Sequence, residues 1–327
     1  SDAPLGISFN PSTSIAAATY NITAITQNGL VASAGIPATG TGLAANVIAD
    51  DAFTNTTSAA INVVYTVVPV SAAGCLGNPF TLTVTVNPEP VVANQTLTIC
   101  SDAPLGVNFN SSTSVAAATY NVTAIILNGL TVSAGGAAVA NNLSAAALAD
   151  DAFTNTTSAA VNVVYTVVPV SAEGCIGNPF TVTVTVNPES VVANQIITVC
   201  SDSPLTGFTL GNDADGPTVV SYNITAITLN GLTISAGIPA TGNGLPATEL
   251  ANDAFTNITS APVNVIYTVV PVGNNGCLGN PFTVTATINP EPVVANQLKS
   301  ICSDAPLGIS FNPSTSIAAA TYNITAI

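Results

Sequence analysis

The stretch Asn162–Pro188 reads NVVYTVVPVSAEGCIGNPFTVTVTVNP and predicts two β-strands joined by a loop. From Phe180 to Val186, hydrophobic residues alternate with threonines, which is the period of a half-buried strand. Gly, Asn and Pro residues between the two hydrophobic runs are typical of a turn. The stretch therefore predicts a β-hairpin with Cys175 at its tip, and close copies of it stand at residues 62–88 and 264–290.

The remaining sequence repeats together with this hairpin. A Ser-Asp step followed by Ala-Pro or Ser-Pro recurs at Ser1, Ser101, Ser201 and Ser303, at intervals of 100, 100 and 102 residues. Intervals of this size are typical of domains. An Asn-Pro-Glu segment marks the seam between copies. We expect domains at 1–88, which lacks its first strand, at 89–188 and at 189–290, with a further truncated repeat at 291–327.

Each copy of about 100 residues contains about seven short hydrophobic runs. Asn128-Gly129 lies between two of them, Ala118–Ile125 and Leu130–Ser133, and predicts a hairpin turn there. This density of strands predicts an all-β chain of tandem immunoglobulin-like β-sandwich domains. Because the proline-rich seams are short, we expect a stiff rod in which each domain adds roughly 35–45 Å.

The composition excludes several classes of partner. The net charge is −15, charged residues make up only 5% of the chain, and Lys299 is its one basic residue. Such a chain has no basic surface for nucleic acid or for anionic membranes. No apolar run is long enough to cross a bilayer, so we expect no membrane insertion. The chain begins and ends inside its repeat pattern without a signal peptide, as expected for an excised piece.

The residues also argue against an enzyme, because the chain has no His and its single Lys occurs in one copy only. Adjacent aspartates on a strand would point to opposite faces. The simplest interpretation of the aspartates is that they are solvated loop carboxylates, and the alternative is calcium binding. The candidate calcium ligands are Asp50, Asp51, Asp150, Asp151, Asp213 and Asp215. No other cofactor is expected.

The six cysteines allow two pairing schemes. One joins Cys100 to Cys175 and Cys200 to Cys277, and leaves Cys75 and Cys302 to partners outside the chain. The other joins cysteines 25 residues apart, across a full strand that exceeds the reach of a disulfide. We therefore expect the first scheme, with the hairpin tip at the pole where the first strand begins. Disulfides imply an oxidising, extracellular compartment.

The motifs Tyr165-Thr-Val-Val-Pro, Gly174-Cys-Ile-Gly and Cys100-Ser-Asp closely resemble the PKD-like, immunoglobulin-like repeats of Bacteroidota. Such repeats occur in giant surface adhesins, including gliding-motility adhesins, that are exported by type IX secretion. The resemblance covers essentially the whole chain. It implies β-sandwich domains, an extracellular location and a role as stalk or filament in attachment. It transfers no catalytic residues.

These observations lead to two hypotheses of function. The first is a structural repeat region of an extracellular filament or adhesin, for attachment to a surface, gliding or prey capture. The second is a binding module whose loops, such as residues 150–157, contact cell-surface glycans. Because 48% of residues are hydrophobic, we expect copies to associate into a homo-oligomeric fibre through Ala-rich stretches. A monomeric stalk is the alternative. The Ala-rich stretches are residues 16–18, 116–118 and 145–147.

Overall fold

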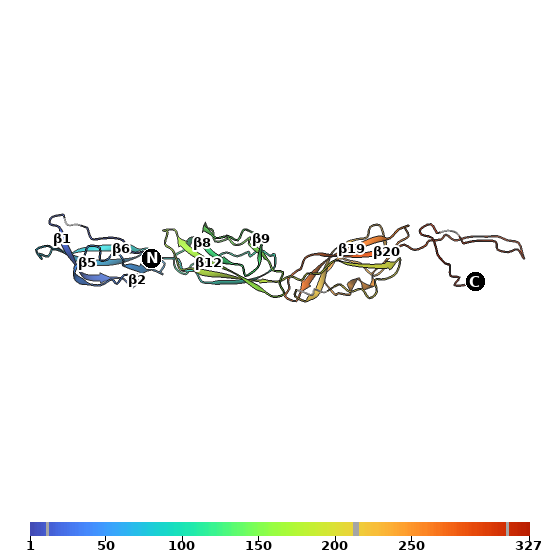
Figure 1. Cartoon of the computed structure of the whole chain (residues 1–327), viewed down its shortest axis with the longest axis horizontal. Coiled ribbons are helices and arrows are strands. Elements are labelled where there is room, and N and C mark those ends of the chain that lie inside the picture. Colours follow the sequence, from blue (N-terminus) through green and yellow to red (C-terminus); the bar gives the residue numbers. More distant parts are fainter. Residues whose placement is uncertain (11–12, 212–215, 312–313) are drawn as a thin grey trace. The chain divides into compact units, whose positions relative to one another are not determined.

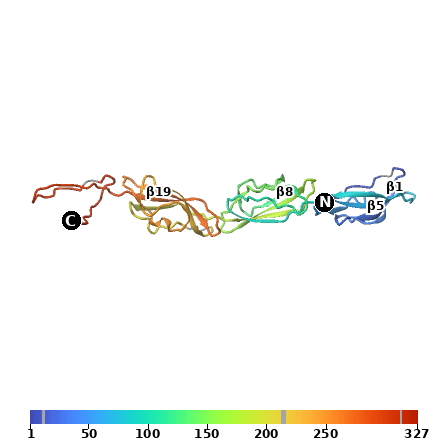
Figure 2. The ribbon, with the colours of Figure 1, turned by 180° about the vertical axis from the view of Figure 1, so that it is seen from behind.

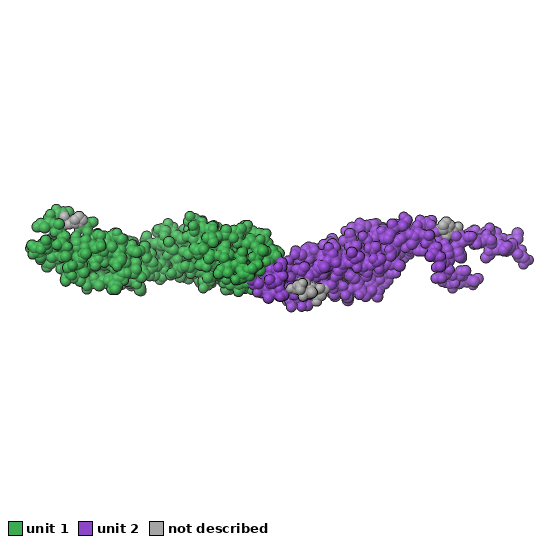
Figure 3. Space-filling model, in the orientation of Figure 1, with its two compact units in different colours: residues 1–154, 162–186 green, residues 155–161, 187–327 purple. Residues whose placement is uncertain are grey.

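The computed structural model describes residues 1–10, 13–211, 216–311 and 314–327. These residues form two compact units (Figure 3). Unit 1 comprises Ser1–Thr154 and Asn162–Val186, and unit 2 comprises Asn155–Val161 and Asn187–Ile327. The regular elements of each unit are β-strands, joined by one short 3-10 helix in the described part of unit 2 (Figures 1 and 2).

The first two repeats share six strands, and the second repeat has one more, β7, at the edge of its larger sheet. In the first repeat, one sheet has the order β3-β1-β5-β6, and β2 pairs with β4. In the second repeat, one sheet has the order β10-β8-β12-β13-β7, and β11 pairs with β9. The strands are β1 (Ala17–Thr26), β2 (Val31–Ala34), β3 (Gly40–Leu43), β4 (Ala52–Thr54), β5 (Ile61–Ser71), β6 (Phe80–Val86), β7 (Gln95–Cys100), β8 (Ala117–Ile126), β9 (Thr131–Ala134), β10 (Ala140–Leu143), β11 (Ala152–Thr154), β12 (Val161–Ser171) and β13 (Phe180–Asn187).

The third repeat has the same topology within unit 2. Its larger sheet has the order β14-β20-β19-β15-β17, and β16 pairs with β18. A short 3-10 helix, η1, precedes β18. The elements are β14 (Gln195–Cys200), β15 (Val219–Thr228), β16 (Thr233–Ala236), β17 (Gly242–Leu245), η1 (Glu249–Asn252), β18 (Ala254–Thr256), β19 (Val263–Gly273) and β20 (Phe282–Asn289).

The alternating hairpin strands build the core of each sandwich. In β13, Phe180, Val182, Val184 and Val186 are buried and the threonines between them are not, as the sequence predicts. The neighbouring strand buries Tyr165 together with the valines two residues before and after it. The expected all-β, immunoglobulin-like sandwich fold is therefore confirmed, and the rod stays a prediction. No helix among the described residues is long and apolar enough to cross a membrane.

The Asn-Gly turn forms, but it does not make the expected hairpin. Asn128 and Gly129 both have positive φ, 49° and 93°. The strands on either side belong to different sheets, because β8 pairs with β10 and β12 whereas β9 pairs with β11. The Asn128 side chain donates a hydrogen bond of 2.8 Å to the carbonyl of Asn162. This bond fixes the turn to the start of β12, so the chain passes from one layer of the sandwich to the other.

The direction of the first strand determines where its cysteine lies. Strand β14 pairs in parallel with β20, the last strand of the third repeat, from Gln195 opposite Val284 to Cys200 opposite Asn289. The C-terminal end of the first strand therefore lies at the end of the sandwich where the last strand leaves it. The hairpin loop that precedes β20 lies at the opposite end.

Candidate functional site at the joint between repeats

A buried aspartate in each repeat bonds to a buried tyrosine. The Tyr65 hydroxyl donates a hydrogen bond of 2.7 Å to Asp51. Burial raises the pKa of Asp51, although the bond from Tyr65 partly lowers it. Burial and the facing carboxylate raise the pKa of the three tyrosines well above the ordinary value of 10. Because these carboxylates accept hydrogen bonds from tyrosines inside the core, their role is structural. The other pairs are Tyr165–Asp151 at 2.6 Å and Tyr267–Asp253 at 2.7 Å.

This arrangement gives no support to a calcium site at the paired aspartates. Asp50 and Asp150 are exposed, whereas Asp51 and Asp151 turn into the core, so neighbouring carboxylates diverge. Among the described residues, no group of three or more His, Cys, Asp or Glu side chains is placed to hold a metal ion. The other two candidate ligands, Asp213 and Asp215, lie outside the described residues.

The loop from residue 150 to residue 157, expected as a glycan-binding loop, uses its polar side chains internally. The Asn155 amide donates to the carbonyl of Ala159 at 2.9 Å and its oxygen accepts from the Thr157 hydroxyl at 2.7 Å. Thr154 donates to the Asp102 carboxylate at 2.6 Å. These atoms are therefore committed to folding the loop.

The recurring Ser-Asp step forms a polar clamp. Asp2 has a φ of 56°, a left-handed conformation that aspartate tolerates better than most side chains. Thr54 donates to its carboxylate at 2.6 Å, and the Asn55 backbone N–H donates to the Ser1 hydroxyl at 2.9 Å. Unit 2 has the same clamp, with Thr256 on Asp202 at 2.6 Å and Asn257 on Ser201 at 2.8 Å.

Glu89, in the seam between the first two repeats, bonds to both of them. Its backbone N–H donates to the carbonyl of Asn55 in the first repeat at 2.9 Å. Its carbonyl accepts from the Ser114 hydroxyl of the second repeat at 2.5 Å, and its side chain accepts from Asn178 at 3.5 Å. Only 1% of Glu89 is exposed. Sequence reasoning placed the seam here but missed the role of Glu89, for which the recurring Asn-Pro-Glu was the signal.

The carboxyl group of Glu89 faces that of Asp2. Burial is the largest cause that raises the pKa of Glu89, and the neighbouring Asp2 carboxyl raises it further. Burial alone would raise the pKa of Asp2, but hydrogen bonds from Glu89 and Thr54 lower it. The Glu89 Oε2 atom is buried and accepts no hydrogen bond in the described part of the chain. Of the two carboxyl groups, Glu89 is therefore the weaker acid and Asp2 the stronger one. Glu291 and Asp202 show the same two directions in unit 2.

The hairpin tip of the second repeat lies against this clamp. The backbone nitrogen of Ser1 donates to the carbonyl of Asn87 at 3.1 Å and lies 3.8 Å from the sulfur of Cys175. A Cβ on Gly177 would stand 2.0 Å from the carbonyl oxygen of Pro90. Gly279 of the third repeat is in the same position, 1.9 Å from the oxygen of Ser190. These glycines allow the linker to pass directly over the hairpin loop.

The predicted disulfides Cys100–Cys175 and Cys200–Cys277 are wrong. Cys100 and Cys277 are disulfide-bonded, whereas Cys75, Cys175, Cys200 and Cys302 are free thiols. The reason is the parallel first strand: Cys200 lies opposite Asn289, about seven strand residues beyond the start of β20. That is about 23 Å of strand, and a disulfide requires Cα atoms within about 7 Å.

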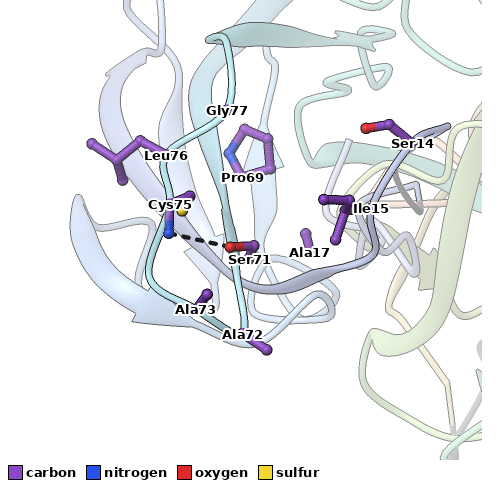
Figure 4. Close-up of a pocket in the computed structure, with 10 residues that line it drawn as sticks. All are labelled: Ser14, Ile15, Ala17, Pro69, Ser71, Ala72, Ala73, Cys75, Leu76 and Gly77. Carbon is purple, nitrogen blue, oxygen red and sulfur yellow. Dashed lines mark hydrogen bonds between the residues drawn. The ribbon is translucent and has the colours of Figure 1, made fainter.

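The corresponding surface of the first repeat is an open, mostly apolar groove of about 430 Å³ (Figure 4). Ile15 and Leu76, on its rim, are 74% and 68% exposed. Pro69 and Gly77 line the groove, and their counterparts in the second repeat, Pro169 and Gly177, lie at the Pro90 linker. The groove therefore corresponds to the surface that contacts the Pro90 linker in the second repeat.

A family model of the PKD-like domain matches residues 32–90, 97–190 and 197–292. No curated protein matches the chain. Mouse protocadherin-24 EC1-3 has 14% identity and a TM-score of 0.22, over 88% of this chain and 94% of that chain. The FN1-FN3 domains of chicken CNTN1 have 10% identity and a TM-score of 0.27, over 83% and 97% respectively. Because these TM-scores are low, the assignment of the chain to a family depends on the PKD-like match alone.

Proposed function

The chain belongs to the PKD-like domain family, and from this premise we propose that it is the structural repeat region of an extracellular filament or giant cell-surface adhesin. In this role it acts as a stalk or fibre for attachment to a surface, for gliding or for prey capture. Domains of this family are scaffolds, and we propose no catalytic activity for the chain. The source that we propose is a Bacteroidota cell that exports the protein by type IX secretion.

The observation that carries this proposal is the joint around Glu89. A buried linker residue with hydrogen bonds to both flanking repeats restricts their relative movement far more than a solvated linker does. A stalk requires this property, whereas a string of independent binding modules does not. Recurrence of the Ser-Asp clamp in unit 2 supports the same construction at other seams.

We propose that the partners are further copies of the chain, packed side by side in a fibre. Ile36 of the first repeat and Ile238 of the third, at equivalent positions, are 89% and 88% exposed. A chain with 5% charged residues has few charges with which to keep such surfaces apart. The disulfide supports an oxidising, extracellular location.

Electron microscopy of the purified protein, combined with a glycan array, tests the proposal. Regular fibres or straight rods without glycan binding are the expected result. Isolated beads joined at variable angles, together with specific glycan binding, would replace the stalk with a binding module.

A further inference from the structure

Three of the four Ser-Asp steps have a preceding residue in this sequence, and that residue is a cysteine each time. Cys100, Cys200 and Cys302 stand directly before Ser101, Ser201 and Ser303. At Ser1, the backbone nitrogen that would join such a residue lies 3.8 Å from the sulfur of Cys175. The chain direction at Ser1 therefore leads to the hairpin loop of the second repeat, and not to a loop of its own repeat.

The strand register gives the same placement in unit 2. Cys200 ends β14 opposite Asn289, and the backbone N–H of Ser201 donates to the carbonyl of Asn289 at 2.8 Å. In unit 1, the Ser1 nitrogen bonds in the same way to Asn87, whose carbonyl lies 3.8 Å from the sulfur of Cys175. The Cys-Ser step thus lies where the last strand leaves its own repeat. In unit 1, the hairpin tip of the next repeat meets it there.

We propose that the cysteine before each Ser-Asp step forms a disulfide with the hairpin-loop cysteine of the following repeat. Cys277 is then the partner of Cys100, 177 residues further along the chain. Both of these are disulfide-bonded. For the four free thiols, the same rule gives no partner within residues 1–327. The disulfide then acts as a covalent staple across the joint between two repeats.

Formation of the staple removes two protons and two electrons from two thiols. The oxidant is a disulfide, either a small molecule or an oxidase with a dithiol site. One cysteine thiolate attacks the donor disulfide and releases a donor thiolate. The second cysteine thiolate then attacks the mixed disulfide, which forms the protein S–S bond and releases the second donor sulfur as a thiolate.

Glutamate-specific proteolysis of the oxidised full chain, under non-reducing conditions, separates the pairing schemes. Cleavage after Glu173, Glu189 and Glu249 gives fragments 1–173, 174–189, 190–249 and 250–327, because Glu89 and Glu291 precede prolines and resist cleavage. The proposal expects a link between 1–173 and 250–327. Links from 1–173 to 174–189 and from 190–249 to 250–327 would overturn it, as would a link between 174–189 and 190–249.

Variants identify the two cysteines involved. Cys100→Ser and Cys277→Ser should each abolish the link, and the matched controls Cys75→Ser and Cys302→Ser should leave it unchanged. A chain extended by one cysteine before Ser1 should gain a second disulfide, between fragments 1–173 and 174–189. If Cys175 of that extended chain reacts with an alkylating agent as fast as in a serine-extended control, the proposal is wrong.

Discussion

Replacing Gly177 with alanine would place a methyl group 2.0 Å from the carbonyl oxygen of Pro90. Carbon atoms in favourable contact are about 3.5 Å apart or more, so the linker would have to move by about 1.5 Å. A shift of that size breaks the 2.5 Å bond between Ser114 and Glu89. The lost hydrogen bond costs about 1 kcal/mol and the overpacking about 1–3 kcal/mol. We therefore expect the joint to lose about 2–4 kcal/mol.

Native-state amide hydrogen exchange at Val91 measures this loss locally. The Val91 N–H donates to Ser112 at 2.8 Å and to Ser114 at 3.0 Å. A loss of about 2 kcal/mol should accelerate its exchange by about 30-fold. Gly77→Ala is the matched control, because its methyl would also contact a proline ring, at 2.8 Å from Pro69 Cγ, but no linker atom. Equal exchange at Val91 in the two variants would show that the contact between residue 177 and the linker does not weaken the joint.

Further predictions concern the buried glutamate, the buried tyrosines and the association of chains. Because the pKa of Glu89 is raised above 4.5, its contribution to stability is present below pH 4.5 and is lost as the pH rises through the folded value. Glu89→Gln should therefore protect the joint better than wild type at pH 7 and equally below pH 4.5; an opposite trend in Val91 exchange would argue against a raised pKa of Glu89. Tyr65→Phe should lower the free energy of unfolding by about 1–3 kcal/mol at neutral pH, because Asp51 stays buried without its donor. Above pH 10, wild type should lose about 1.4 kcal/mol per pH unit for each buried tyrosine, and urea titrations should show a shallower loss in Tyr65→Phe. Sedimentation at micromolar concentration should show assemblies larger than one chain, and a monomer throughout would exclude side-by-side packing.

Local patterns were enough to predict the strands. The alternation from Phe180 to Val186 specifies a half-buried strand whatever its neighbours are, and the structure buries those four residues. The Asn128-Gly129 pair specified a turn, but its sequence could not show which sheet the next strand joins. That choice depends on the bond from Asn128 to Asn162, which lies 34 residues away.

The cysteine pairing could not be predicted from spacing. It depends on whether the first strand runs parallel or antiparallel to the last one, and a short hydrophobic run fits either orientation. Similarly, a glutamate in a proline-rich seam resembles a solvated linker residue. Its burial arises only when the next repeat supplies Ser114 and Asn178. Both failures concern contacts between segments far apart in the sequence.

Small-angle X-ray scattering of the full chain tests the stalk most directly, because it measures the radius of gyration in solution. Three sandwiches of about 40 Å each, joined end to end, form a rod of about 120 Å with a radius of gyration of about 35 Å. A compact globule of the same length would have a radius of about 20 Å. We expect a radius of about 35 Å or more at both low and high salt, because side-by-side packing of such rods can only enlarge it. A value near 20 Å would show that the repeats fold back on one another and would contradict the stalk.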